Sequence, residues 1–370
     1  MQQRVIISQD IEHDLAQAIA ETEHDRVFVL TDDITQECCL PKVASLFAKH
    51  NATTITIRHD DTNKTLATLA DVWTALQRGG ATRHSLLVNL GGGMVTDLGG
   101  FAAATFKRGI NFINIPTTLL AMVDAAVGGK TGINFGGLKN EVGAFANARY
   151  VIVNTCFLDT LDTANLCSGY AEMLKHSLIN NAQMWAEHVN FDILQPDLAE
   201  LQRMVAASIA VKEHIIADDP QEHGIRKALN FGHTIGHALE EFSMQQPGGA
   251  VVSARLLPLA RARTAPKNTL LHGYAVAFGL IGELYISARK AGFPTARLHQ
   301  TARFIRENYG AVAFTCDDYP TLLNLMRHDK KNTSDTINFT LLHDIGDIRI
   351  NQTATDEEIR EALDFIREGY

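Results

Sequence analysis

The feature that most constrains this chain is the alternation of short apolar segments with helix-like segments up to about residue 155. The short segments are rich in Val, Ile and Leu, as buried strands are, and segments such as 63–77 between them have helical apolar spacing. This alternation predicts a mostly parallel sheet with helices on both faces. The expected strands are Arg4–Ser8, Arg26–Leu30, Thr53–Arg58, Ser85–Leu90, Phe112–Ile115 and Tyr150–Val153.

Beyond about residue 161 the pattern changes to long helical segments. Helices are expected at 164–180, 197–218, 228–242 and 274–291, and a strand or hairpin at 336–342. A length of 370 residues suits two domains. We therefore expect an α/β, Rossmann-like domain over residues 1–160 and a mainly α-helical domain over residues 161–370.

Composition excludes several classes of protein. Lys and Arg total 33 against 42 Asp and Glu, so the formal charge of −9 argues against a nucleic-acid or membrane-surface binder. No apolar run reaches the ~18 residues of a membrane span, and the first residues lack the apolar core of a signal peptide. The five cysteines form no C-x-x-C pair. A cytoplasmic protein is expected.

A glycine-rich turn marks the first candidate site. An apolar strand runs into Gly91, Gly92 and Gly93 and then into an expected helix, so backbone N–H groups could face a pyrophosphate. The G-x-G-x-x-G spacing is absent, and such a turn is often only a tight connection. Asp32 ends an earlier strand, where its carboxylate could accept ribose hydroxyls or cap a helix.

A second glycine-rich region surrounds Lys130. The sequence 127–132 superficially resembles a P-loop, but Asp124 stands where that motif needs its first glycine. Lys130, Lys139 and Asn140 on such a loop suit a multiply anionic ligand. The alternative is a solvated lysine pair.

Titratable residues in the second part have the spacing of a metal site. Glu172 and Lys175 lie three apart, hence on one helical face, although such pairs are usually weak surface ion pairs. His233 and His237 are four apart on one face, a spacing found at metal sites. Two histidines and a glutamate can leave coordination positions open for substrate. Spacing alone leaves open whether His237 or His272 joins His233.

Basic residues accumulate around this group. They indicate a pocket for a phosphorylated or carboxylated small molecule, although Lys330 and Lys331 could also form a solvated turn. The residues are Lys212, Arg226, Lys227, Lys330 and Lys331. The segment 245–269, with three prolines and three arginines, is expected to be an exposed basic insertion, with a binding loop as the alternative.

Taken together, these residues resemble the 3-dehydroquinate synthase family of sugar phosphate cyclases. The resemblance covers nearly the whole chain in the right order. The matching segments are Gly91–Asp97, Phe101–Gly109, Pro116–Gly132, Lys139–Phe145, Ser168–His176, Leu229–Glu240, His272–Gly279 and Asp329–Lys331.

The resemblance implies an NAD-binding N-terminal domain and a metal-binding helical C-terminal domain that enclose one active site, usually in a homodimer. The implied reaction converts 3-deoxy-D-arabino-heptulosonate 7-phosphate to 3-dehydroquinate and phosphate, in the shikimate pathway to chorismate and the aromatic amino acids. It proceeds by transient NAD-dependent oxidation, phosphate elimination, re-reduction and intramolecular aldol closure. The enzyme would be a phosphate-eliminating lyase.

The resemblance also assigns residues. Zinc, with cobalt as the alternative metal, would be bound by Glu172, His233 and His272, which moves His237 to the substrate phosphate. The matching NAD positions are Asp32, Asp60, Lys64, Gly93, Met94, Val95, Thr96, Asp97, Thr117, Thr118, Lys130, Lys139, Phe157, Leu158, Asp159 and Thr160. The catalytic and substrate positions are Asp124, Lys130, Asn140, Lys175, Lys212, Arg226, Asn230, His237 and Lys330, and Arg108 matches an arginine lent to the neighbouring subunit's phosphate site.

Other activities share this type of chain. Cyclases acting on sedoheptulose 7-phosphate or glucose 6-phosphate and glycerol-type polyol dehydrogenases are the alternatives. Retention of Lys130, Asn140 and Arg226 favours a carboxylated substrate, and the phosphate-binding set favours a cyclase. Tyr274 replaces the family's usual glutamate after His-Gly, a departure expected to tune activity.

Overall fold

The computed structural model describes residues 3–245, 251–252, 269–328 and 336–368 and contains two compact units. Unit 1 consists of Met1–Leu161 and Asp197–Ile209, and unit 2 of Asp162–Pro196 and Ala210–Tyr370. Lys330, Lys331 and nearly all of the segment 245–269 lie outside the described residues. No helix in the described ranges combines the length and apolar character that a bilayer span requires.

Unit 1 is built on a six-stranded sheet whose strands are all parallel. The six predicted strands are confirmed, with bounds that differ by at most a few residues. In spatial order they are β1 (Arg4–Ile7), β8 (Tyr150–Val153), β5 (Asn111–Pro116), β4 (Leu86–Gly91), β2 (Val27–Asp32) and β3 (Thr53–Ile57).

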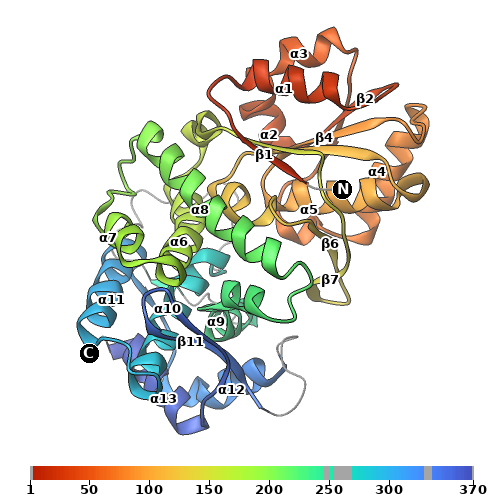
Figure 1. The fold of residues 1–370 in the computed structure, drawn as a ribbon. Helices are drawn as coiled ribbons and strands as arrows, with labels where there is room; N and C mark the ends of the chain where they lie inside the picture. Colours follow the sequence, from red (N-terminus) through yellow and green to blue (C-terminus); the bar gives the residue numbers. More distant parts are fainter. Residues whose placement is uncertain (1–2, 246–250, 253–268, 329–335, 369–370) are drawn as a thin grey trace. The chain divides into compact units, whose positions relative to one another are not determined.

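The connections of the sheet reverse direction once. The chain moves one way across the sheet from β1 to β3 and then back from β3 to β4 and β5. Because parallel crossovers are right-handed, the reversal places the connecting helices on opposite faces, and α1 and α5 lie on opposite sides in Figure 1. The helices are α1 (Ile11–Glu21), α2 (Asp33–Cys38) and α3 (Ala44–Lys49) before the reversal, and α4 (Leu66–Arg78) and α5 (Gly93–Thr105) after it.

This reversal creates a topological switch point between the neighbouring strands β2 and β4. The helix after β2 covers one face and the helix after β4 covers the other. In open parallel sheets, ligands bind at the carboxyl ends of the strands at such a point. Asp32 ends β2 and Gly91 ends β4, so two of the predicted cofactor segments lie at this point.

A hairpin between β5 and β8 was not predicted, because its glycines favoured a loop. Strands β6 (Lys130–Phe135) and β7 (Leu138–Phe145) pair antiparallel. Gly136 and Gly137 form the turn with φ of +61° and +84°, a conformation that favours glycine. A Cβ atom on Gly143 would lie 2.1 Å from the carbonyl oxygen of Thr131, so glycine lets the two strands approach closely.

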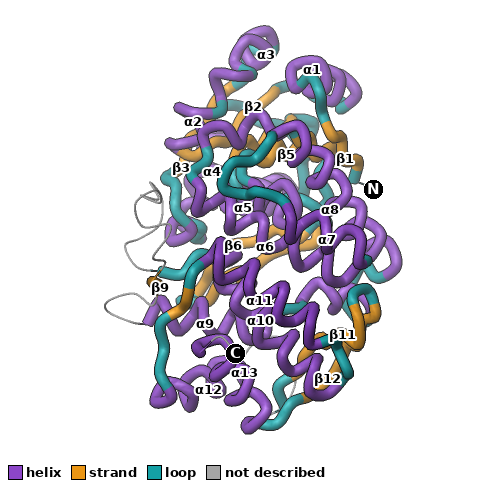
Figure 2. Tube along the Cα trace, turned by 90° about the vertical axis from the view of Figure 1, so that its left-hand side faces the viewer, coloured by secondary structure: helices purple, strands orange, loops and turns teal. Residues whose placement is uncertain are grey.

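Unit 2 is mainly helical, as predicted (Figure 2). Two antiparallel ribbons accompany the helices: β11 (Asn338–Asp344) with β12 (Asp347–Thr353), and β9 (Val251–Val252) with β10 (Ala311–Val312). The helices are α6 (Thr163–Asn180), α7 (Ala182–Asn190), the later part of α8 (Leu198–Asp218), α9 (His233–Gln245), α10 (His272–Lys290), α11 (Thr295–Tyr309), α12 (Tyr319–His328) and α13 (Asp356–Glu368).

The predicted helix over 228–242 begins later than expected. Residues Ile225–Asn230 form a separate 3₁₀ turn, and α9 starts at His233. The cause is Gly232, whose φ of +79° is incompatible with a continuous right-handed helix. His233 is therefore the first residue of α9. It lies at the N-terminus of the helix, where the first N–H groups have no acceptor within the helix itself.

Candidate active site

Three potential metal ligands converge in unit 2. Glu172 lies in the middle of α6, whereas His233 and His272 are the first residues of α9 and α10. Oε1 of Glu172 lies 3.4 Å from Nε2 of both histidines. The three ligand atoms lie within 4.8 Å of one another, so one ion could contact them all.

The chemistry of these ligands fits a divalent metal. Oε1 of Glu172 is buried and accepts no hydrogen bond from any described residue, although a buried carboxylate oxygen normally has a donor. Two imidazoles and a carboxylate are ligands that zinc prefers, and cobalt accepts the same set. Three protein ligands leave a position open for substrate, as catalytic zinc sites do.

The second ring nitrogen of each histidine is also engaged. Nδ1 of His233 lies 3.1 Å from the carbonyl oxygen of Phe231, and Nδ1 of His272 lies 3.0 Å from Oε2 of Glu240. Donation from Nδ1 would leave the Nε2 lone pair for a metal that displaces the proton on Nε2. Burial alone lowers the pKa of His272, but the carboxylates of Glu240 and Glu172 outweigh it and raise the pKa to about 10.

Glu172 and Lys175 form a buried ion pair, so the alternative of a surface pair is wrong here. Their side chains are 0% and 1% exposed, and Nζ of Lys175 contacts Oε2 of Glu172. Burial alone would raise the pKa of Glu172, but Lys175 and then His233 hold it well below its usual range. Glu172 is therefore charged at neutral pH, as a metal ligand must be.

A second group of potential ligands shares His272. His237, Glu240 and His272 also bring their ligand atoms within 4.8 Å of one another. The ring of His237 has its centroid 5.3 Å from that of His233 and 5.8 Å from that of His272. Spacing left open whether His237 or His272 joins His233. Because His233 and His272 both face Oε1 of Glu172, the geometry favours His272.

The N-terminus of α9 is fixed by a residue that sequence reasoning missed. Glu283 of α10 is fully buried, and its carboxylate accepts the backbone N–H groups of Gly232, Thr234 and Ile235 at 2.7, 2.9 and 3.2 Å. A glycine before α9 offers no capping side chain, so Glu283 takes that role from another helix. It thereby holds the backbone on both sides of His233.

The predicted anion-binding residues of unit 2 lie on neighbouring elements. Arg226, only 2% exposed, donates from Nη1 to the carbonyl of Pro220 at 2.6 Å, and Nδ2 of Asn230 donates to Oε1 of Glu222 at 2.8 Å. Both belong to the 3₁₀ turn before α9, and Lys212 is buried on α8. Glu222, at a φ of +63°, was also missed, because its partner lies eight residues ahead.

In unit 1, Asp32 is at the switch point and caps a helix. Its Oδ1 accepts a hydrogen bond from the backbone N–H of Thr35 at 2.7 Å, and the hydroxyl of Thr35 accepts one from the backbone N–H of Asp32. The structure therefore shows the helix-cap alternative. Burial raises the pKa of Asp32 despite these bonds. The predicted turn after β4 is confirmed: Gly92 precedes α5, whose first turn contains residues 93–97 with no side-chain cap at the N-terminus. Binding of a cofactor by these residues stays a prediction.

Lys64 connects two predicted functions. Its Nζ lies 2.5 Å from Oδ2 of Asp97 and 2.5 Å from Oδ1 of Asn140, so a predicted NAD residue contacts a predicted substrate residue. Burial raises the pKa of Asp97, against the opposing effect of the Lys64 ammonium. Lys130 and Lys139 are exposed on the hairpin, and Nζ of Lys139 lies 3.6 Å from Oδ2 of Asp61.

The remaining predicted residues of unit 1 are dispersed along the carboxyl ends of the strands. Thr117 and Thr118 follow β5, and Asp124 lies in a π-helical turn of the kind often found at functional sites. Residues 157–160 follow β8, which β5 separates from β4. Phe157 and Leu158 are buried, and Asp159 pairs with Lys42 at 2.6 Å. These four are therefore not beside the switch point.

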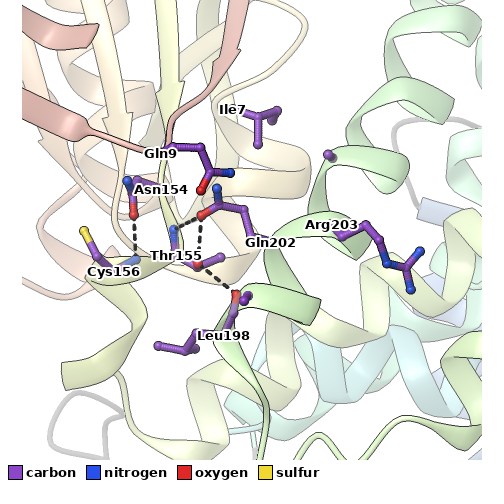
Figure 3. A pocket seen from close by; sticks show the side chains of 10 residues that line it. Ile7, Gln9, Asn154, Thr155, Cys156, Leu198, Gln202 and Arg203 are labelled. Carbon is purple, nitrogen blue, oxygen red and sulfur yellow. Dashed lines mark hydrogen bonds between the residues drawn. The ribbon is translucent and has the colours of Figure 1, made fainter. Parts of the chain in front are cut away.

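A cavity of about 610 Å³ lies elsewhere in unit 1, beside the ends of β1 and β8 (Figure 3). Its polar side chains bond one another: Oε1 of Gln202 accepts from the backbone N–H and the hydroxyl of Thr155. None of the predicted site residues is among its lining residues, which are Ile7, Gln9, Asn154, Thr155, Cys156, Leu198, Ala199, Gln202, Arg203 and Ala206.

Comparison with known proteins adds independent evidence. The family model for the N-terminal domain of 3-dehydroquinate synthase matches residues 54–168, and that for its C-terminal domain matches residues 169–257 and 260–332. A 3-dehydroquinate synthase from Parabacteroides distasonis is 50% identical over 369 residues, covering 100% of this chain and 99% of the relative. One from Clostridium tetani is 32% identical over 343 residues, covering 92% and 86%.

Solved structures with lower identity share the fold. A 2-deoxy-scyllo-inosose synthase complexed with carbaglucose-6-phosphate, NAD⁺ and Co²⁺ has a TM-score of 0.82 at 22% identity, covering 100% of this chain and 96% of that one. A 2-epi-5-epi-valiolone synthase from Streptomyces hygroscopicus, with NAD⁺ and Zn²⁺ bound, has a TM-score of 0.80 at 24% identity, covering 100% and 98%.

Proposed function

Because this chain belongs to the 3-dehydroquinate synthase family, we propose that it converts 3-deoxy-D-arabino-heptulosonate 7-phosphate to 3-dehydroquinate and phosphate. It would thus be a phosphate-eliminating lyase of the shikimate pathway. The observation that carries this proposal is the convergence of Glu172, His233 and His272 beside the buried ammonium of Lys175. A metal at that point would meet a substrate hydroxyl and a proton-carrying group together.

Zinc, with cobalt as the alternative, would be held by Glu172, His233 and His272. When bound, such a metal supplies a Lewis acid that makes a coordinated hydroxyl more acidic. Lys175 balances the charge of Glu172 and keeps that carboxylate ionised. His237, whose ring lies next to those of both ligand histidines, is suitably placed to hold the substrate phosphate.

We assign NAD binding to the switch point of the sheet. The N-terminal turn of α5, residues 93–97, has no side-chain cap and suits the pyrophosphate, and Asp32 suits the ribose hydroxyls. NAD held by these residues would supply reversible hydride chemistry, without net oxidation of the substrate. Further contacts are proposed from Asp60, Lys64, Thr117, Thr118, Lys130 and Lys139 and, away from the switch point, from residues 157–160.

The substrate is an anion at both ends, and the chain offers cations and amides for each. We propose that Arg226, Asn230, His237 and Arg108 hold the phosphate. Lys130, Asn140 and Lys212 would orient the carboxylate and hydroxyls, with Asp124, Lys175 and Lys330 completing the site. Most of the rate enhancement would then come from positioning and charge stabilisation. Residues 1–160 would bind the cofactor and contribute part of the substrate site, and residues 161–370 would bind the metal and the rest of the substrate.

We also propose a homodimer, in which Arg108 serves the partner's phosphate site. Arg108 and Lys107 have φ of +69° and +50°, an uncommon backbone conformation that persists mostly where function requires it. The β6–β7 hairpin exposes Phe135, Leu138 and Phe145, which are 51%, 50% and 68% exposed, as an interface would. Sedimentation equilibrium tests this: a monomer at micromolar concentration would contradict it.

A cytoplasmic location is proposed on chemical grounds. The five cysteines are free, and a reducing compartment keeps them so. The proposed substrate, a phosphorylated keto acid, is a small metabolite and not a macromolecule.

The deciding experiment is phosphate release from the heptulosonate substrate with and without a chelator. We expect chelator-sensitive release with no net NADH. Glucose 6-phosphate and sedoheptulose 7-phosphate serve as competing substrates, since another cyclase would prefer one of them. Net NADH from glycerol would indicate a polyol dehydrogenase. Absence of chelator-sensitive release from all three phosphates would overturn the proposal.

A further inference from the structure

We propose that Glu240 is a positioning residue for the metal ligand His272. Its carboxylate accepts a hydrogen bond from the Nδ1–H group of the imidazole. This bond directs the Nε2 lone pair to the position shared with Glu172 and His233. This inference rests on the proposed function, because it concerns the metal site assigned there.

The contact is direct and shielded. Oε2 of Glu240 lies 3.0 Å from Nδ1 of His272, and the Glu240 side chain is 8% exposed while that of His272 is 28% exposed. A hydrogen bond at that distance between a buried carboxylate and an imidazole is short enough to fix both the ring orientation and the tautomer. On the other side of the ring, Nε2 lies 3.4 Å from Oε1 of Glu172.

The same stretch of α9 also holds the backbone that leads into His272. The hydroxyl of Ser243 donates to the carbonyl of Glu240 at 2.7 Å and accepts the N–H of Leu270 at 3.0 Å. Leu270 precedes His272 by two residues, after the long interval that separates α9 from α10 in sequence. One turn of α9 therefore fixes the start of α10 by its backbone and the His272 ring by Glu240.

Helix packing makes this arrangement rigid. A Cβ atom on Gly236 would lie 3.0 Å from the carbonyl oxygen of Ala275, and one on Gly279 would lie 1.9 Å from that of Gly232. The two helices therefore meet backbone against backbone, with little freedom to slide. Glu240 lies on α9 one turn after Gly236, so the rigid crossing also fixes the distance from its carboxylate to His272.

A direct ligand role for Glu240 is the competing interpretation, since it also forms a group with His237 and His272. That arrangement would use Nδ1 of His272 for the metal and leave the buried Oε1 of Glu172, which accepts no hydrogen bond from the described residues, without the ion. The positioning role uses both nitrogens of His272 and both carboxylates at once.

The test compares Glu240→Gln and Glu240→Ala with Glu241→Gln, an exposed neighbour on the same helix. Zinc affinity is measured by competition with a chromophoric chelator, and the visible spectrum is recorded after loading with Co²⁺. Loss of an outer hydrogen-bond partner typically costs about 10–100-fold in metal affinity. We expect a loss near the lower end for Glu240→Gln, which keeps an acceptor oxygen, and a larger one for Glu240→Ala. Both variants should also shift the Co²⁺ bands. Glu241→Gln should keep the zinc affinity and the Co²⁺ spectrum of the wild type.

Wild-type affinity and an unchanged Co²⁺ spectrum in Glu240→Ala would overturn the inference. Complete loss of zinc binding in Glu240→Gln, equal to the loss in Glu172→Gln, would also overturn it. Substitution of a positioning residue should cost less zinc affinity than substitution of a ligand. Circular dichroism of the metal-free variants identifies any that fail to fold, and Glu240→Gln, of nearly equal shape, then serves as the test. If the wild type itself binds no zinc, the proposed function fails instead.

Discussion

Nζ of Lys64 lies 2.5 Å from Oδ1 of Asn140, so a residue predicted to bind NAD holds the side chain of a residue predicted to bind substrate. Asn140 itself has a φ of +51° and is exposed on the β7 strand, where its amide would otherwise be free to rotate. The same ammonium contacts Asp97 in the first part of α5. Lys64 thereby connects residues of the two binding functions predicted for unit 1.

We expect Lys64→Met to weaken both functions. It removes the cation from Asp97 and the donor from Asn140 while keeping a long apolar side chain in a site that is 3% exposed. Removing one partner of a buried, hydrogen-bonded charge pair typically costs several kcal/mol. We therefore expect NAD affinity and kcat/KM to fall by at least about 10-fold each.

Fluorescence titration with NAD and initial-rate kinetics measure the two effects. Lys49→Met, an exposed lysine at the end of α3, is the control and should behave as the wild type. Loss of NAD affinity with an unchanged KM for the sugar phosphate would show that Asn140 is held by other means.

Local pattern predicted much of the architecture. The six strands of the sheet follow from short apolar runs, and Glu172 and Lys175 follow from helical spacing, because each signal lies within one element. The β6–β7 hairpin was missed, since Gly132 and Gly143 normally argue against strands and are explained only by the approach of the two backbones.

The supporting residues of the site could not be predicted in the same way. Glu240 faces His272 across 32 residues, and Glu283 caps α9 from 51 residues away. Neither contact has a sequence period, because tertiary packing alone brings the partners together. The predicted ligand histidines were recognisable by type and by resemblance to a family, whereas the contacts of Glu240 and Glu283 appear only once α9 and α10 are placed.

His272→Ala should abolish metal binding and turnover together. Of the three proposed ligands the substitution leaves only Glu172 and His233, and two ligands would hold zinc far more weakly than three. We expect zinc content, measured by elemental analysis, to fall to background and phosphate release to fall by more than about 100-fold. His214→Ala, which changes a histidine whose side chain is 80% exposed on α8, should retain both.

Glu283→Gln should lower the stability of unit 2 through α9. The amide keeps one acceptor oxygen, but its NH₂ group would face backbone N–H donors, so at least one buried N–H group loses its acceptor. An unsatisfied buried group costs about 1–3 kcal/mol, and we expect a loss of that size in the free energy of unfolding. Glu307→Gln, an exposed change on α11, should stay within about 0.5 kcal/mol of the wild type.

Urea unfolding of the metal-free proteins measures this difference. The metal-free form is needed because a bound ion would itself stabilise the folded state and mask the loss. Equal midpoints and slopes for Glu283→Gln and wild type would mean that the three N–H groups at the start of α9 find other acceptors.

Asp32 should make stability depend on pH in a direction opposite to that of its neighbour Asp33. Burial raises the pKa of Asp32, so the folded protein holds this proton more tightly than the unfolded chain. Its contribution to stability is therefore largest below the unfolded-state pKa, about 3.9, and falls as pH rises through the folded-state value. Asn also caps helices, so Asp32→Asn removes the titration and keeps the cap.

The neighbouring carboxylate provides the matched control. Burial alone would raise the pKa of Asp33, but bonds from the backbone and ring of His59 outweigh it and lower the pKa. Asp33 thus adds stability above its unfolded-state pKa and loses it as pH falls. With urea unfolding from about pH 3.5 to 6.5, a range spanning the ordinary Asp pKa, the wild type should lose stability relative to Asp32→Asn as pH rises. Relative to Asp33→Asn it should gain. Parallel curves for both variants would show that burial at the end of β2 does not disfavour the charge of Asp32.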